Sequence, residues 1–154
     1  MVMLRRAGWR DVWRLYRWRT DPVTARMMIG APPTIPQHVW WCWRVFRDKR
    51  RALYIAYGER PIGTVRLDWR TLAECEISVT VAPEWRSRGY GTAIIDAAVS
   101  HVRAALIVCG IETMRVVAYI KAENIASHRA FSRAGFEPVR CPREYACLVK
   151  EVAA

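Results

Sequence analysis

Apolar residues recur along the chain with two different periods, and these periods predict its helices and strands. Spacing of three and four residues is typical of a helix that buries one face, whereas alternation or a short apolar run is typical of a strand. Helices are expected over residues 8–19, 34–48, 92–108 and 125–133, and strands over residues 1–6, 52–57, 61–69, 74–81, 114–119, 136–140 and 144–150. The order β-α-α-β-β-β-α-β-α-β-β predicts a mixed α/β (α+β) domain with one parallel crossover through Gly89.

Local signals place the ends of several elements. Asp21 precedes Pro22 and should end the first helix, because a residue before proline avoids the helical region. Thr34 and Gln37 have the spacing of a capping box at the start of the second helix. Asn124 is a good N-cap for the last helix. The final two strands are expected to form a hairpin through residues 141–143.

Composition predicts one domain, residues 1–154, with a core of its own. The chain is 53% apolar and contains eight Trp, which excludes intrinsic disorder. The longest apolar stretch, residues 104–111, is far shorter than the roughly 20 residues of a membrane span. No signal peptide is apparent, so we expect a cytoplasmic protein without a membrane partner. The five Cys never form a C-x-x-C pair, which predicts reduced thiols and no metal site.

The positive charge is concentrated near the N-terminus. Residues 1–51 hold 12 Lys and Arg against 3 Asp and Glu, so they carry +9 of the total +11. Such a field could attract nucleic acid, a membrane surface or a phosphate-bearing small molecule, or it could simply be a solvated face. Six Trp lie in the same region, of which Trp9, Trp13, Trp40 and Trp43 are interpreted as core residues.

A short glycine-containing loop connects the strand at 74–81 to the helix at 92–108. It contains Arg86, Arg88, Gly89 and Gly91, and Thr92 follows in the first helical turn. Free N–H groups and the helix dipole at such a start favour an anion, so the loop is a candidate pyrophosphate site. It is neither a Walker loop nor a dinucleotide fingerprint, because the lysine and the third glycine of those motifs are missing.

A second motif lies further along the chain. The combined pattern reads Val81-x-Pro83, Arg86-x-x-Gly89-x-Gly91 and then Asn124-x-x-Ser127-x-x-x-Phe131-x-x-x-Gly135-Phe136. This pattern, together with the element order, resembles the GCN5-related N-acetyltransferase (GNAT) superfamily. The resemblance implies a mostly antiparallel central sheet flanked by about four helices. It also implies acetyl-CoA as the donor, a primary amine as the acceptor and direct transfer between them.

The resemblance assigns the cofactor site residue by residue. It implies that backbone N–H groups of the loop bind the CoA pyrophosphate, and these belong to Arg86, Ser87, Arg88, Gly89, Tyr90, Gly91 and Thr92. Val79 and Val81 would pair with pantetheine through their backbone, which requires their strand to separate from its parallel neighbour. The Val79 N–H could also polarise the thioester carbonyl. Asn124, Ser127 and Phe131 would complete the site.

The same resemblance suggests catalytic groups. Glu76 is the first candidate for the general base that takes the proton of the amine, with Glu74 and Glu123 as alternatives. Many family members have a tyrosine at the position of Phe131, and it protonates the departing thiolate. Here Tyr119, Tyr145 or water would take that role, or the thiolate leaves unassisted, since a thiol has a pKa near 8.5.

The acceptor side shows a narrower similarity. Trp18-Arg19-Thr20-Asp21-Pro22 and His38-x-x-Trp41 are similar to the branch that acetylates nucleotide-linked amino sugars, as in pseudaminic acid biosynthesis, with Thr20 where asparagine is usual. Arg19, His38 and Trp41 would then bind substrate, with arginine pairing to phosphate and tryptophan stacking on uracil. Ribosomal-protein N-terminal acetyltransferases share parts of the pattern. An inactive CoA-binding domain, a basic nucleic-acid-binding module and a homodimer also remain open.

Overall fold

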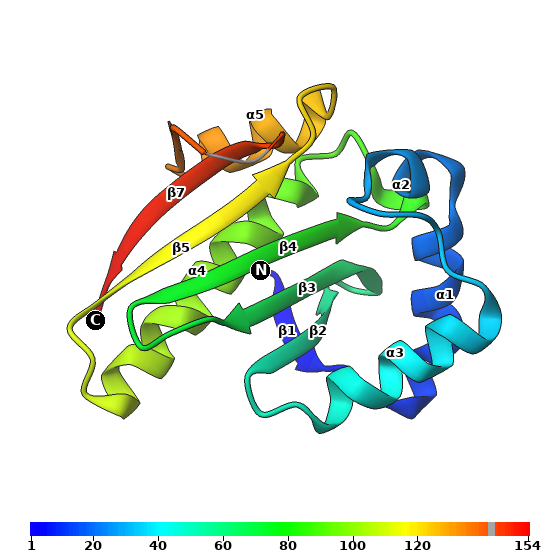
Figure 1. Cartoon of the computed structure of the whole chain (residues 1–154), viewed down its shortest axis with the longest axis horizontal. Coiled ribbons are helices and arrows are strands. Elements are labelled where there is room, and N and C mark those ends of the chain that lie inside the picture. Colours follow the sequence, from blue (N-terminus) through cyan, green and yellow to red (C-terminus); the bar gives the residue numbers. More distant parts are fainter. Residues whose placement is uncertain (142–143) are drawn as a thin grey trace.

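The computed structural model describes residues 1–141 and 144–154. One seven-stranded sheet runs through the molecule in the order β1-β2-β3-β4-β5-β7-β6, and only β4 and β5 are parallel (Figure 1). The strands are β1 (Met3–Arg6), β2 (Arg51–Tyr57), β3 (Pro61–Trp69), β4 (Glu74–Val81), β5 (Thr113–Ile120), β6 (Glu137–Val139) and β7 (Ala146–Ala153). The helices are α1 (Val12–Thr20), α2 (Pro22–Met27), α3 (Ile35–Arg47), α4 (Tyr90–Cys109) and α5 (Ile125–Arg133).

The mixed, mostly antiparallel sheet and its parallel crossover through α4 confirm the predicted fold class. Helix α2 was not predicted. Asp21 does leave the helical region, at ψ 132°, but its side chain then accepts from the Thr24 N–H and caps a new helix that begins at Pro22. Proline fits the first turn of a helix as well as it ends the preceding one. β6 and β7 pair as expected, although residues 142 and 143 of the predicted turn lie outside the described residues.

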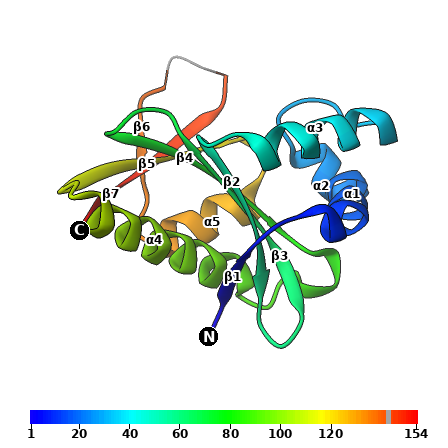
Figure 2. The same ribbon diagram turned by 90° about the horizontal axis from the view of Figure 1, so that it is seen from below.

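The sheet separates two apolar cores, and alternation along β2 contributes to both. Leu53 and Ile55 pack with α1 and α3 on one face, whereas Tyr54 and Ala56 pack with α4 on the other. Figure 2 shows α1 to α3 beside the N-terminal strands and α4 and α5 on the opposite side. Cys42 and Cys75 are buried free thiols, and burial raises their pKa to about 11 and about 12.

The four Trp interpreted as core residues are instead exposed. The exposed fractions are 57% for Trp9, 60% for Trp13, 58% for Trp40 and 40% for Trp43. Helix α1 buries Val12, Leu15 and Trp18, and α3 buries His38, Cys42 and Val45. These stripes leave Trp13, Trp40 and Trp43 on the outward sides of the two helices, and Trp9 lies in the short turn of residues 9–11 before α1. Helical spacing alone does not show which side of each helix is buried and which faces outward.

By length and composition alone, α4 is long and apolar enough to cross a membrane. The sequence had not indicated this, because its unbroken apolar runs are short. Polar residues such as Asp96 and Ser100 interrupt those runs. The apolar face of α4 packs against the sheet in the larger core through Ile94, Ile95, Ala98, Val99, Val102 and Leu106. In this fold α4 therefore serves as a core helix.

Strands β4 and β5 separate soon after they meet. Their parallel register spans three pairs and ends where Glu76 faces Val117. β4 remains paired with β3 as far as Val81, and β5 remains paired with β7 as far as Ile120. The two strands therefore diverge within one sheet and leave a gap in it.

Gly63 allows β3 to approach β4 beside this gap. A Cβ at this position would lie 2.3 Å from the Thr80 carbonyl oxygen and 2.9 Å from the Ile94 side chain. We expect Gly63→Ala to lower the free energy of unfolding by about 3 kcal/mol, because the contact is with backbone that cannot move aside. Urea denaturation measures the difference.

Gly58→Ala is the matched control for this substitution. Its Cβ would meet only Ile62, at 3.8 Å, so the change should stay within about 0.5 kcal/mol. Equal effects of the two substitutions would show that the approach of β3 to β4 is not a constraint.

Candidate active site

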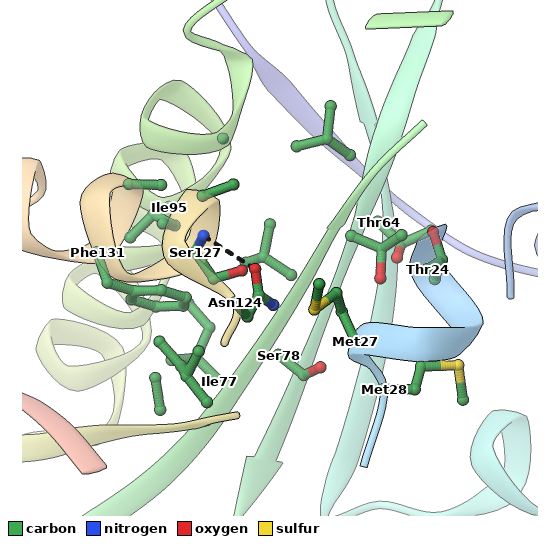
Figure 3. Close-up of a pocket in the computed structure, with 18 of the residues that line it drawn as sticks. Thr24, Met27, Met28, Thr64, Ile77, Ser78, Ile95, Asn124, Ser127 and Phe131 are labelled. Atoms are coloured by element: carbon green, nitrogen blue, oxygen red, sulfur yellow. Dashed lines mark hydrogen bonds between the residues drawn. The ribbon is translucent and has the colours of Figure 1, made fainter. Parts of the chain in front are cut away.

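A cleft of about 770 Å³ occupies the gap between β4 and β5 and opens to both faces of the sheet. In Figure 3, Ile77 and Ser78 point to opposite sides of β4. Ile77 lies on the side of α5 with Phe131 and Asn124, and Ser78 lies on the side of α2. The cleft therefore passes through the sheet and joins two differently lined chambers.

The edge of β4 along the cleft carries unpaired backbone groups. The bonds that bracket this strand run from the Arg70 N–H to the Glu74 oxygen and from the Ala82 N–H to the Ile62 oxygen, both at 2.9 Å. In the intervening antiparallel register, residues of even number therefore pair with β3 and residues of odd number face away from it. Val79 and Val81 lie beyond the end of the β5 pairing, so their N–H and C=O groups face the cleft.

The loop before α4 presents further N–H groups to the same chamber. Ser87 and Gly89 adopt positive φ, at 61° and 79°. Gly89 is the N-cap residue of α4, and no side chain caps this helix start. Alternating left-handed residues followed by a free helix N-terminus form an anion-binding concavity. Gly91 packs closely against α5, where a Cβ would lie 3.3 Å from Ala130.

The Arg86 side chain points away from this concavity. It donates to a carboxylate oxygen of Asp21 and to the Thr24 hydroxyl, the latter at 2.8 Å. Burial acts to raise the pKa of Asp21, but hydrogen bonds from Arg86 and from the Thr24 N–H outweigh it and hold the pKa below its ordinary value. The pair ties the start of α2 to the loop, so the Asp21-Pro22 motif has a structural role.

Asn124 has a capping role that leaves part of its amide available. Its Oδ1 accepts from the Ser127 N–H at 3.2 Å at the start of α5. The amide NH₂ group is not used by this bond, and the residue lines the cleft. Phe131 also lines it, packed edge-on against Phe136 with a centroid separation of 5.0 Å. Its phenyl ring offers no proton to a leaving group.

Charged side chains line the other chamber. Glu76 forms ion pairs with Arg70 and, at 3.7 Å, with Arg66. The buried Asp68 lies 3.1 Å from Arg66. Hydrogen bonding to Glu76 raises the pKa of Arg70, although burial acts to lower it, so this guanidinium stays charged. Glu76 is the one carboxylate among the described residues that line the cleft.

Arg19 is the second polar feature of this chamber. Its guanidinium lies 4.0 Å from the centroid of the Trp41 ring and 3.2 Å from Nδ1 of His38. Burial and the positive charge of Arg66 lower the pKa of Arg19, but an arginine remains protonated at neutral pH. In the described part of the chain no carboxylate pairs with it.

His38 was expected to bind substrate, but it does not line the cleft. It is 0% exposed, and its Nε2 lies 2.8 Å from the Val12 carbonyl oxygen, which can only accept a hydrogen bond. Nε2 therefore carries the proton and Nδ1 accepts from Arg19. Burial lowers the pKa of His38, so the ring is neutral and positions Arg19 from behind.

The structure brings most of the predicted site residues to one cleft and leaves a few outside it. Besides His38, the exceptions are Arg88, which lies over the Trp85 ring, and Glu123, which is exposed. Glu74 is also outside and pairs with Arg115 at 3.9 Å. Tyr119 and Tyr145 both line the cleft. No three His, Cys, Asp or Glu of the described residues form a metal-binding group.

Several lining residues were not predicted. They include Met27 at the end of α2, Met28 directly after it, Thr64, Arg66 and Arg70 near β3, and Ser78 of β4. The polar alternation of β3 and β4 could have indicated Thr64, Arg66 and Ser78. The two Met had no such signal, because helix α2 was not expected.

Comparisons with known proteins agree with this architecture. Residues 2–137 match the family model described as an acetyltransferase (GNAT) domain, so the chain belongs to the GNAT acetyltransferase family. No curated protein matches the chain by sequence.

Solved structures of similar fold include three acetyltransferases. Spermidine N-acetyltransferase from Vibrio cholerae, in complex with CoA and spermine, has a TM-score of 0.82 at 13% identity, over 99% of this chain and 95% of that one. Aminoglycoside acetyltransferase AAC(6')-Ib, in complex with coenzyme A, has a TM-score of 0.78 at 22% identity, over 97% and 94%. Campylobacter jejuni PseH, in complex with acetyl coenzyme A, has a TM-score of 0.70 at 12% identity, over 97% and 98%.

Proposed function

We propose that this acetyltransferase moves the acetyl group of acetyl-CoA to the primary amine of a nucleotide-linked amino sugar, in the cytoplasm. The observation that carries the proposal is the chamber in which the free edge of β4 meets the uncapped start of α4. One side offers unpaired amides to an extended chain, and the other offers N–H groups to an anion. Pantetheine is an extended chain and pyrophosphate is an anion, and CoA joins the two in the order in which the chamber offers these two sites.

The donor fits the residues that are present. The N–H groups of residues 87–92 would hold the pyrophosphate, and the backbone of Val79 and Val81 would pair with pantetheine. The Asn124 amide and Ser127 would contact the pantetheine from the opposite wall. When bound, the donor supplies an acetyl thioester near the point where β4 and β5 part. The Val79 N–H would donate a hydrogen bond to the carbonyl oxygen of this thioester.

Glu76 would act as the base from the other chamber. Its carboxylate, which pairs with Arg66 and Arg70, would accept a proton from the acceptor ammonium, directly or through a water. The neutral amine then forms the C–N bond as the C–S bond breaks. The bonded nitrogen loses its second proton and the departing thiolate gains one, through Tyr119 or Tyr145, which line the cleft, or through water. The thiol pKa near 8.5 makes this last step undemanding.

The charge of the cleft supports an anionic acceptor. Of the residues that the structure describes, six arginines and one carboxylate line it: Arg19, Arg66, Arg70, Arg86, Arg129, Arg133 and Glu76. Arg86 is neutralised by Asp21, and Arg66 and Arg70 share Glu76 and Asp68. Arg19 keeps an uncompensated charge, and the positive charge of Arg66 acts against it. A phosphate bound between the two guanidinium groups would reduce this repulsion. A polycation such as the spermine bound by the Vibrio cholerae enzyme would be repelled here.

Gly89→Asp tests the donor site. Wild-type protein at acetyl-CoA concentrations 100 times the dissociation constant should gain about 2.7 kcal/mol, seen as a higher melting temperature. The aspartate has space, since nothing lies within 4 Å of a Cβ there, but its charge should repel pyrophosphate and abolish most of the shift. Gly89→Asn has the same shape and backbone strain without the charge and should keep more of it. No shift in the wild type would overturn the donor assignment.

Glu76→Gln tests the base. We expect kcat at pH 7 to fall by about 100-fold, because the amide cannot accept the proton. Part of the rate should return at higher pH, where more of the acceptor amine is already neutral. Glu74→Gln and Glu123→Gln change carboxylates outside the cleft and should leave kcat within about twofold. A Glu76→Gln enzyme with normal kcat would exclude Glu76 as the base.

Arg19→Gln tests the acceptor. With a UDP-linked amino sugar, the variant should show a KM about tenfold higher and an unchanged KM for acetyl-CoA, because a charge-assisted bond to phosphate is lost. Arg47→Gln removes the same charge from an exposed position of α3 and is the control. Release of the CoA thiol measures the rate, and a peptide α-amine and spermine complete the panel. Faster turnover of either of these would contradict a nucleotide-sugar acceptor.

A further inference from the structure

An aromatic surface that the acetyl-transfer cleft does not use lies on the outward sides of α1 and α3 and on the turn of residues 9–11 that precedes α1. We define it by Trp9, Trp13, Trp40 and Trp43, which are 40–60% exposed and do not line the cleft. Tryptophan is rarely so exposed without a role, since its large ring gains most from burial. Four such residues on neighbouring elements call for a partner.

One ring contact of the surface joins the turn before α1 to α3. Trp9 packs edge-on against Phe46 of α3 with a centroid separation of 5.5 Å. Trp40 and Trp43 stack at 5.1 Å with an interplanar angle of 11°. Arg47 lies over the Trp43 ring at 4.8 Å. Trp13 packs edge-on against Tyr16 of its own helix, so each of the four rings has an aromatic neighbour that holds it in place.

The surface is basic as well as aromatic. Its exposed charged residues are Arg10, Arg17, Arg44 and Arg47. The two carboxylates within residues 9–47 are already neutralised: Asp11 is buried between Arg5 and Arg14, at 2.7 and 3.0 Å, and Asp21 is bound to Arg86. Nothing in this stretch offsets the exposed arginines, so the partner should be anionic.

We propose that this aromatic surface docks on an anionic phospholipid membrane. Trp side chains favour the boundary between headgroups and acyl chains, because the indole combines an apolar body with an N–H donor. Arginines around them gain free energy from anionic headgroups. A helix-borne surface of tryptophans edged by arginines meets both requirements at once. The partial exposure of the four rings suits shallow insertion.

Two other occupants fit the observations less well. A second copy of the chain would bring the same arginines against one another, which like charges disfavour. A nucleic acid would stack bases on open ring faces, but Trp43 already has Trp40 and Arg47 over its ring. The membrane contact needs only exposed ring edges and the charge around them.

Sedimentation with vesicles tests the proposal on the whole chain. Vesicles of phosphatidylcholine mixed with phosphatidylglycerol should bind the protein, shift its Trp fluorescence to shorter wavelength and release it as salt rises. Vesicles of phosphatidylcholine alone should bind at least tenfold more weakly. Absence of binding to the anionic vesicles at low salt would overturn the proposal.

Paired variants locate the contact. W40S/W43S and, separately, R44Q/R47Q should each lower the partition coefficient about tenfold while the thermal shift with acetyl-CoA stays unchanged. I107S/V108S removes apolar residues of α4 that are even more exposed than these Trp and should bind vesicles normally. Equal binding by W40S/W43S would overturn the proposal. So would a homodimer in size-exclusion chromatography that this variant dissociates, or an RNA complex that it abolishes while vesicle binding persists.

Discussion

The rest of the site depends on the parting of β4 and β5. A continuous sheet would bond every backbone amide and separate its two faces completely. Because the parallel register ends at Glu76 and Val117, the edge of β4 is left with free amides, and the two faces communicate through the gap. One structural feature therefore provides a binding edge for an extended donor and a passage by which an acceptor on the opposite face can reach it.

The elements around the gap are braced from both sides. Arg86 links the loop before α4 to the cap of α2, and Lys121 Nζ donates to the Arg26 carbonyl oxygen from the end of β5, at 2.9 Å. Asn124 fixes the start of α5 and still faces the cleft. Residues of the acetyltransferase motif thus combine capping and bridging with their proposed contacts to the donor. This double use explains why a capping interpretation and a binding interpretation of Asn124 do not compete.

The N-terminal basic region serves two separable surfaces. Arg19 turns inward, where Trp41 and the neutral His38 hold an uncompensated charge in the cleft. Arg44 and Arg47 turn outward beside exposed Trp. The same residue types on the neighbouring helices α1 and α3 therefore meet different environments. Neither the number of arginines in the sequence nor the net charge that they create predicts which of them face the cleft and which face outward.

The sequence by itself determined the element order apart from α2, the single parallel crossover and the family, because periodicity, caps and the glycine loop are local signals. It also indicated Glu76, Asn124 and the loop at 86–92, whose positions relative to motifs are set along the chain. Only the tertiary structure decided which tryptophans are buried, that His38 lies behind Arg19, and that Arg66 joins Glu76. Those relations arise from packing between elements far apart in sequence. The residues of a helix do not specify which other element will cover one of its faces.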